Sequence, residues 1–297
     1  MQILSLGVAE EPFFVYSRLK KQFDELENIK GLSIEQGQSG EITFYGIFLN
    51  DEEIKRNLDL YTYERIKYFI AAALCNVIID YTKEKLICKL VEENYYFLDG
   101  IEKEKILLES RKKMNEIIES SGFSNIRYEI IKKVLDFLDN NFEFNFEGFL
   151  TFRLKEYLKV INNIIEDAAS KYFLEREYIQ FINLLKYFLD LQNTKIDLVH
   201  IVPDEKAYIL YDKELKEVKN EFFEMLSKNL KLNLSKDDIL LSRLISLSPQ
   251  QIIFHRHCSA NLSQDILEIL SLVFEQRIHF CDECEIEKSK TITKSEE

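Results

Sequence analysis

The stretch FLTFRLKEYLKVINNIIEDAASKYFLEREYIQFINLLKYFLDL, residues 149–191, decides the fold class of this chain. Its large apolar side chains recur every three or four residues, first from Phe152 to Phe173 and again from Tyr178 to Leu189. That spacing places them along one face of an amphipathic helix. The whole chain of 297 residues has only three prolines and eight glycines, which further favours long helices.

The same spacing extends toward the N-terminus, so we predict that residues 52–194 are helical. Apolar stripes run from Ile66 to Ile78 and from Ile130 to Leu138, and Ser120-Ser121-Gly122 separates two helices. The longest apolar stretch, residues 68–79, is too short to span a bilayer. It therefore predicts a buried core helix and no membrane span.

The first fifty residues have a different pattern, typical of a small β-α-β-β unit. Residues 3–8 form a short apolar run suited to a strand, and apolar residues at helical spacing follow from Phe14 to Leu26. Two further strands are expected at 32–35 and 42–48, on either side of a turn at 37–40.

Residues after 194 return to the two-residue period of strands. Residues 196–202 alternate, 203–206 form a turn, and 207–211 form the returning strand of a hairpin. Two helix–strand repeats follow, with Ser235 and Ser263 as the expected helix N-caps. The chain after Cys284 is rich in Glu, Lys, Ser and Thr, which predicts a disordered tail.

These patterns predict an α+β fold that is predominantly helical. We expect a small α/β unit at residues 1–50, a helical bundle at 51–195, and a C-terminal α+β domain at 196–285 that contains the hairpin and the two helix–strand repeats. The disordered tail would occupy residues 286–297.

The charge balance bears on partners and location. The chain has 39 basic and 52 acidic residues, a net charge of −13, and its basic runs lie among carboxylates. Such a surface repels phosphate backbones, so nucleic-acid binding is disfavoured. The N-terminus lacks the basic and small-residue features of a signal peptide, so we expect the protein in the cytoplasm.

Three of the five cysteines and three of the four histidines fall between residues 255 and 284. They are His255, His257, Cys258, His279, Cys281 and Cys284. Zinc prefers four Cys or His ligands, and the C-x-x-C of Cys281 and Cys284 supplies two. Side chains alternate along a strand, so neighbouring strands could bring His255 or His257 near Cys281, with His279 on the same face as Cys281.

The sequence leaves three interpretations of this cluster open. The residues could be buried or terminal side chains that hold no metal. They could form a structural zinc site from His255, His257, His279, Cys281 and Cys284. They could also form a redox or catalytic centre, although no helix is predicted after the C-x-x-C, as thioredoxin-type motifs require. Beyond zinc, no cofactor motif is present.

Several segments together resemble the YtxC-like sporulation protein family of spore-forming Firmicutes. They are residues 149–157, 175–181, 244–255 and 274–281, and the similarity extends over about residues 60–284. What the resemblance implies is an association with endospore formation. It implies no particular reaction, cofactor or catalytic residue.

Our expectation from the sequence is therefore a cytoplasmic, non-enzymatic protein that acts in sporulation by binding another protein, as yet unidentified. The alternative is a metal-dependent or thiol-dependent enzyme centred on the C-terminal Cys/His cluster. The first hypothesis rests on the lack of a nucleophile elbow, P-loop, dinucleotide fingerprint or metallohydrolase motif.

Overall fold

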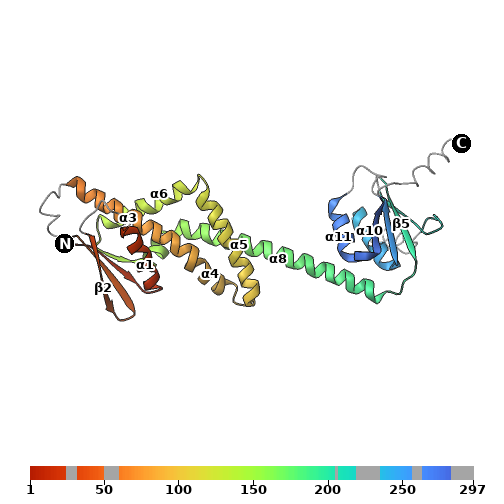
Figure 1. Cartoon of the computed structure of the whole chain (residues 1–297), viewed down its shortest axis with the longest axis horizontal. Coiled ribbons are helices and arrows are strands. Elements are labelled where there is room, and N and C mark those ends of the chain that lie inside the picture. The colour runs from red at the N-terminus through yellow and green to blue at the C-terminus, as the bar shows by residue number, and fades with distance from the viewer. Residues whose placement is uncertain (25–31, 50–59, 205–206, 219–234, 256–262, 282–297) are drawn as a thin grey trace. The chain divides into compact units, whose positions relative to one another are not determined.

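A computed structural model describes residues 1–24, 32–49, 60–204, 207–218, 235–255 and 263–281. The chain divides into two compact units, Met1–Phe173 and Leu174–Glu297 (Figure 1). Helix α8, Lys155–Leu191, begins in the first unit and ends in the second. The α+β, predominantly helical fold class is confirmed.

The first unit contains a four-stranded sheet of order β2-β3-β1-β4. Its strands are β1 (Gln2–Val8), β2 (Leu32–Ser39), β3 (Ile42–Leu49) and β4 (Glu143–Asn145). Strands β1 and β2 each pair antiparallel with β3, and β4 pairs parallel with β1. The three strands predicted from the sequence are confirmed. The predicted turn is shorter than expected, because Gly37 lies within β2 and Gly40, at φ 62°, makes the reversal.

Strand β4 was not predicted, and it lies inside the region expected to be helical. Its central residue, Phe144, pairs with Leu6 of β1 and is 1% exposed. Three residues are too few to display the two-residue alternation that identifies a strand. The strand exists because the sheet edge supplies its hydrogen bonds, including the one that Ser5 N donates to Phe142 O at 2.8 Å.

Helices make up the rest of the first unit. They are α1 (Pro12–Asp24), α3 (Leu60–Tyr81), the π-helical turn η1 (Thr82–Leu86), α4 (Ile87–Asn94), α5 (Gly100–Glu119), α6 (Phe123–Leu138) and α7 (Phe146–Arg153). Helix α3 is the predicted core helix, and Ile70, Leu74 and Ile78 in it are fully buried. Within the described part of the chain, no helix is long and apolar enough to cross a membrane.

One hydrophobic core joins the first sheet to these helices. Leu6 of β1 and Ile47 of β3 belong to the same buried cluster as Leu19 of α1 and Leu74 of α3. The core therefore draws on residues on both sides of position 50. The division into ranges 1–50, 51–195, 196–285 and 286–297 stays a prediction.

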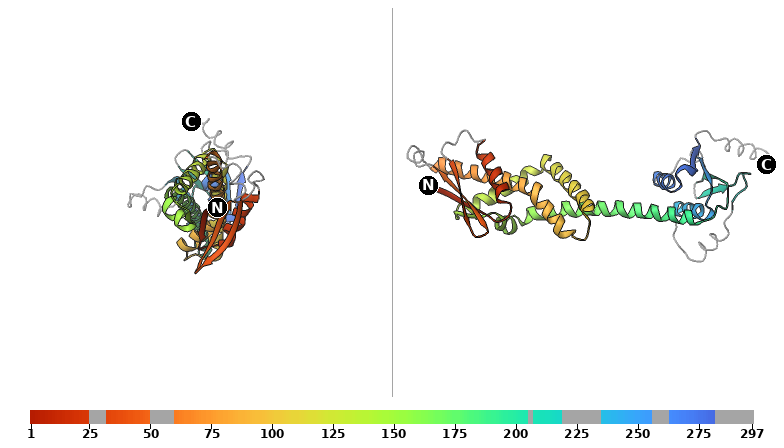
Figure 2. Two further views of the ribbon diagram at one scale, coloured as in Figure 1. Left: turned by 90° about the vertical axis from the view of Figure 1, so that its left-hand side faces the viewer. Right: turned by 60° about the horizontal axis from the view of Figure 1, so that its bottom comes forward.

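The second unit contains another four-stranded sheet, of order β6-β5-β7-β8. Its elements after α8 are β5 (Leu198–Pro203), β6 (Tyr208–Tyr211), α10 (Lys236–Leu247), β7 (Gln251–His255), α11 (Gln264–Phe274), the 3-10 turn η3 (Glu275–Arg277) and β8 (Ile278–Cys281). Strands β5 and β6 form the predicted hairpin, β7 pairs parallel with β5, and β8 pairs parallel with β7. The right-hand view of Figure 2 shows this sheet and its helices from another direction.

The two faces of the second sheet differ. Ile201 and Phe254 lie in the core with Leu244 of α10 and Leu270 of α11. Because side chains alternate along a strand, the neighbouring positions, among them His200, face the opposite side. The sheet expected from the hairpin and the two helix–strand repeats is confirmed. Its histidines lie on the face opposite to the one that packs against α10 and α11.

Candidate functional site

The structure brings part of the predicted Cys/His cluster together across two neighbouring strands. Strands β7 and β8 are parallel partners, and their register pairs His255 with Cys281 and Ile253 with His279. Paired residues of adjacent strands project to the same face. His255 and Cys281 therefore share one face of the sheet, and His279, which is exposed, lies on that face two residues earlier.

His200 joins this face, although the sequence placed it outside the cluster. Strand β5 lies on the other side of β7 and pairs His200 with Ile253. The Nδ1 atom of His200 lies 3.1 Å from Nε2 of His255, and the ring centroids are 5.3 Å apart with planes 19° from parallel. The strand pattern of residues 196–202 locates His200 in a strand, but only the order β5-β7-β8 reveals its neighbour.

Burial favours the neutral form of both imidazoles. His255 is 4% exposed, and burial lowers its pKa, with a further lowering from His200. Burial also lowers the pKa of His200, and the carboxylate of Asp212 partly opposes that shift. Two neutral rings can share the contact only if one nitrogen donates and the other accepts. The pair is therefore suited to a packed N–H···N hydrogen bond.

The predicted zinc ligands fall partly within the described residues, which include His255, His279 and Cys281. His257, Cys258 and Cys284 lie outside the described residues. Within residues 1–24, 32–49, 60–204, 207–218, 235–255 and 263–281, no three His, Cys, Asp or Glu side chains are grouped so as to hold a metal ion. Zinc binding by His255, His257, His279, Cys281 and Cys284 stays a prediction.

A second surface of interest lies on α8, in its part that belongs to the second unit. Ile182 and Leu189 of this part are buried in the second core. Next to them on the helix, five large apolar side chains are between 45% and 67% exposed. They are Leu174, Phe181, Leu184, Phe188 and Leu191, and we call them the α8 stripe. The sequence identified the apolar periodicity of this helix but not that half of the apolar face stays uncovered.

The α8 segment contacts α11 and η3 through residues that flank the buried Ile182 and Leu189 on the helix. Lys186 forms an ion pair with Glu275, and Tyr178 lies near the carboxylates of Glu268 and Asp265, which, after burial, raise the pKa of its phenol. Ile182 and Leu189 define the side of the helix that faces the core. The α8 stripe lies beside that side and is exposed.

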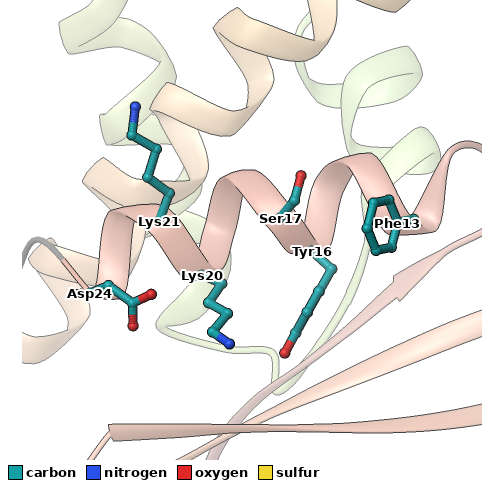
Figure 3. A pocket seen from close by; sticks show the side chains of 6 residues that line it. All are labelled: Phe13, Tyr16, Ser17, Lys20, Lys21 and Asp24. Atoms are coloured by element: carbon teal, nitrogen blue, oxygen red, sulfur yellow. The ribbon is translucent and has the colours of Figure 1, made fainter.

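Cavities in the first unit indicate a functional site less clearly than the α8 stripe or the histidine pair. One of about 410 Å³ runs along α1 and is lined by Phe13, Tyr16, Ser17, Lys20, Lys21 and Asp24. Figure 3 shows Tyr16 and Lys20 extending from α1 toward the sheet, whereas Lys21 extends to the other side. The Tyr16 ring stacks on Tyr45 at 5.2 Å, and the Ser17 hydroxyl donates to the Phe14 carbonyl at 2.9 Å. The Ser17 hydroxyl is therefore engaged in a local contact of the helix.

A second cavity of about 380 Å³ lies between α6 and the start of α8, and its walls are mainly apolar. A third, of about 250 Å³, lies near the loop after β1. Glu147 Oε1 accepts backbone hydrogen bonds from Ala9 and Glu10 there, and Lys89 pairs with Glu10. These contacts hold the Glu10 and Glu147 carboxylates in place, which is a structural role.

Comparison with known proteins agrees with the resemblance seen in the sequence. The profile of the YtxC-like family matches residues 68–279, more than half of the chain. The chain is also 25% identical over 217 residues to "Uncharacterized protein YtxC" of Bacillus subtilis (strain 168), a match that covers 68% of this chain and 75% of that protein. No solved structure matches the chain. The chain therefore belongs to the YtxC-like family.

Proposed function

We propose that this chain is a non-enzymatic, cytoplasmic protein that acts in sporulation by binding a protein partner through the α8 stripe. The sporulation context rests on the family resemblance, and the cytoplasmic location on the expectation from the N-terminal sequence. The binding role rests on the exposed apolar surface of α8.

The observation that carries the proposal is the contiguity of the α8 stripe. Exposed apolar residues elsewhere, such as Phe152 and Leu108, are normal when scattered singly. A contiguous patch is different, because leaving it in water costs free energy that association recovers. The α8 stripe places five large apolar side chains along one helix, which supports a protein-binding surface.

The histidine pair offers less support for catalysis. His255 is almost fully buried, and its Nε2 atom is already engaged with Nδ1 of His200. A general base has to reach the proton that it abstracts. We therefore assign the pair a structural role, in which it fixes the packing of β5 against β7.

A structural zinc site remains a second proposal. The pairing of His255 with Cys281 in register supports it, because it places a nitrogen and a sulfur ligand on one sheet face. The test is the metal content of untagged protein and of a Cys281→Ser/Cys284→Ser variant. About one zinc per chain, lost in the variant, would establish the site, and metal-free protein with unchanged folding would exclude it.

The binding proposal is tested in a spore-forming host that encodes the chain. Phe181→Ser/Leu184→Ser removes the centre of the α8 stripe, and Leu108→Ser/Phe152→Ser removes two comparably exposed side chains outside it. We expect the first variant, at unchanged protein level, to lower the count of heat-resistant spores and the control to match the parent. A photo-crosslinking residue at position 181 should trap a protein, and one at position 152 should not. Equal spore counts and no crosslink at 181 would contradict the proposal.

A further inference from the structure

We propose that the α8 stripe binds a second copy of this chain, so that two α8 helices pack antiparallel. This inference rests on the proposed function, because it names the partner of the same surface. Four observations on α8 carry it: the spacing of the stripe, its area, its single charge, and its independence from the core of the second unit.

The spacing matches what one helix needs to pack along another. Leu174, Phe181 and Phe188 repeat every seven residues, and Leu184 and Leu191 follow Phe181 and Phe188 by three residues each. This is the a/d pattern of a two-helix seam, in which side chains of one helix fit between those of the other. A helix with the same pattern is a complementary partner, and a second copy supplies one.

The area is sufficient for a weak dimer. A whole aromatic side chain offers about 150 to 250 Å², so the half-exposed stripe and the neighbouring Tyr187 present about 600 Å². Two copies would together bury about 1,200 Å², which is the lower limit of specific interfaces. The expected dimer therefore dissociates on dilution.

The charge on the stripe selects the orientation. Glu177 is exposed and lies between Leu174 and Phe181 on the helix. In a parallel pair the two Glu177 carboxylates would face each other, and such like-charge contacts are unfavourable. In an antiparallel pair they are separated, and a two-fold axis between Phe181 and Leu184 brings Leu174 of one copy near Leu191 of the other.

The contacts within the second unit leave the stripe available. Ile182 and Leu189 face the core of that unit, and the Lys186–Glu275 ion pair lies on that side of the helix as well. Dimerisation would therefore cover the stripe without rearranging β5–β8, α10 or α11. Rigid-body association of this kind needs no unfolding step.

The test is sedimentation equilibrium of the purified full chain between about 1 and 100 μM, a range chosen for micromolar dissociation constants. We expect a monomer–dimer equilibrium in the parent. Phe181→Ser/Leu184→Ser should weaken association by about tenfold or more, as for the loss of central interface side chains. Leu108→Ser/Phe152→Ser should match the parent, and Glu177→Leu should strengthen association. Circular dichroism confirms that each variant is folded.

Orientation is tested with Leu174→Cys and Leu191→Cys introduced into separate chains and mixed under mild oxidation, with the parent as the control for native cysteines. Antiparallel packing predicts a disulfide between the two different variants. Disulfides within each variant alone would overturn that orientation. A parent that stays monomeric, or a dimer that persists in Phe181→Ser/Leu184→Ser, would overturn the inference.

The two proposals fail in different ways. If the parent is monomeric but the crosslink at position 181 in cells traps a different protein, the second-copy inference is wrong and the binding role stands. If position 181 traps neither a second copy nor another protein, both are wrong. If it traps a second copy and the stripe variant is monomeric, both are supported.

Discussion

The two halves of α8 have the same apolar periodicity in the sequence but different surroundings in the structure. In residues 155–173 the apolar face is almost completely buried in the first core. Its buried members are Tyr157, Ile161, Ile164, Ile165, Ala168 and Ala169. In residues 174–191 only Ile182 and Leu189 are buried, and the α8 stripe is exposed.

Helical periodicity therefore identifies the apolar face of a helix but not what covers it. In the first half, α3, α5 and α6 belong to the core that includes the helix. In the second half, Ile182 and Leu189 join the core that includes α10, α11 and the second sheet, and the rest of the apolar face stays uncovered. The uncovered side is where we expect a partner.

The largest effect should come from shortening one side chain in each half. Ile161→Ala removes atoms from a fully buried position, which costs about 2 to 5 kcal/mol of unfolding free energy. Leu184→Ala, measured at low protein concentration where any dimer has dissociated, should change the unfolding free energy by less than about 0.5 kcal/mol. Urea unfolding measures both. Equal losses would mean that the α8 stripe is covered within a single chain.

A smaller effect is expected for two serines that carry the same sequence signal. Ser235 caps α10, and its hydroxyl accepts from Asp238 N at 3.1 Å in a capping box. Ser263 holds the same position in α11 but makes no side-chain cap hydrogen bond. Ser235→Ala should cost about 1 kcal/mol, and Ser263→Ala clearly less. Thermal unfolding measures the loss of stability in each variant. A larger loss for Ser263→Ala would contradict the assignment of Ser235 as the stronger cap.

The smallest effect concerns acidification of the histidine pair. Burial lowers the pKa of both His200 and His255 in the folded chain, so the unfolded chain binds more protons. Stability from the neutral pair is therefore fully present above the unfolded value of about 6.5, and it is lost as the pH falls below that value.

The measurement is thermal unfolding between pH 8 and pH 5, values that bracket the usual histidine pKa, in a chelating buffer that removes metal. His200→Asn should reduce the loss of melting temperature on acidification relative to the parent. His279→Asn, which replaces an exposed histidine of the same sheet, is the matched control and should follow the parent. An unchanged slope in His200→Asn would show that the pair does not titrate.

Much of the fold could be predicted because periodicity and caps are local signals. The core helix around Leu74, the hairpin of β5 and β6, and the two helix–strand repeats were all expected and are present. Strand β4 was missed because Phe144 sits in a segment of three residues, whose conformation depends on pairing with β1. Gly37 was placed in a turn because glycine is common there, but the register of β2 against β3 continues past it.

The candidate site was predicted less completely, because it depends on contacts between strands that are far apart in the sequence. Alternation along strands correctly put His255 and Cys281 on a shared face once β7 and β8 are neighbours. His200 lies 55 residues before its partner His255 in the sequence. Nothing local reports which strand lies between two others, so the pair could not be recognised.

By itself, the sequence determined the helical character of α8, the strands on either side of the hairpins, and the family to which the chain belongs. These follow from residue spacing, which acts over a few positions along the chain. Only the tertiary structure decided that His200 meets His255 and that the apolar face of α8 is covered in one half and open in the other. Both depend on the order of strands and on which helices pack together, and these are set by the burial of apolar surface between residues far apart in the chain.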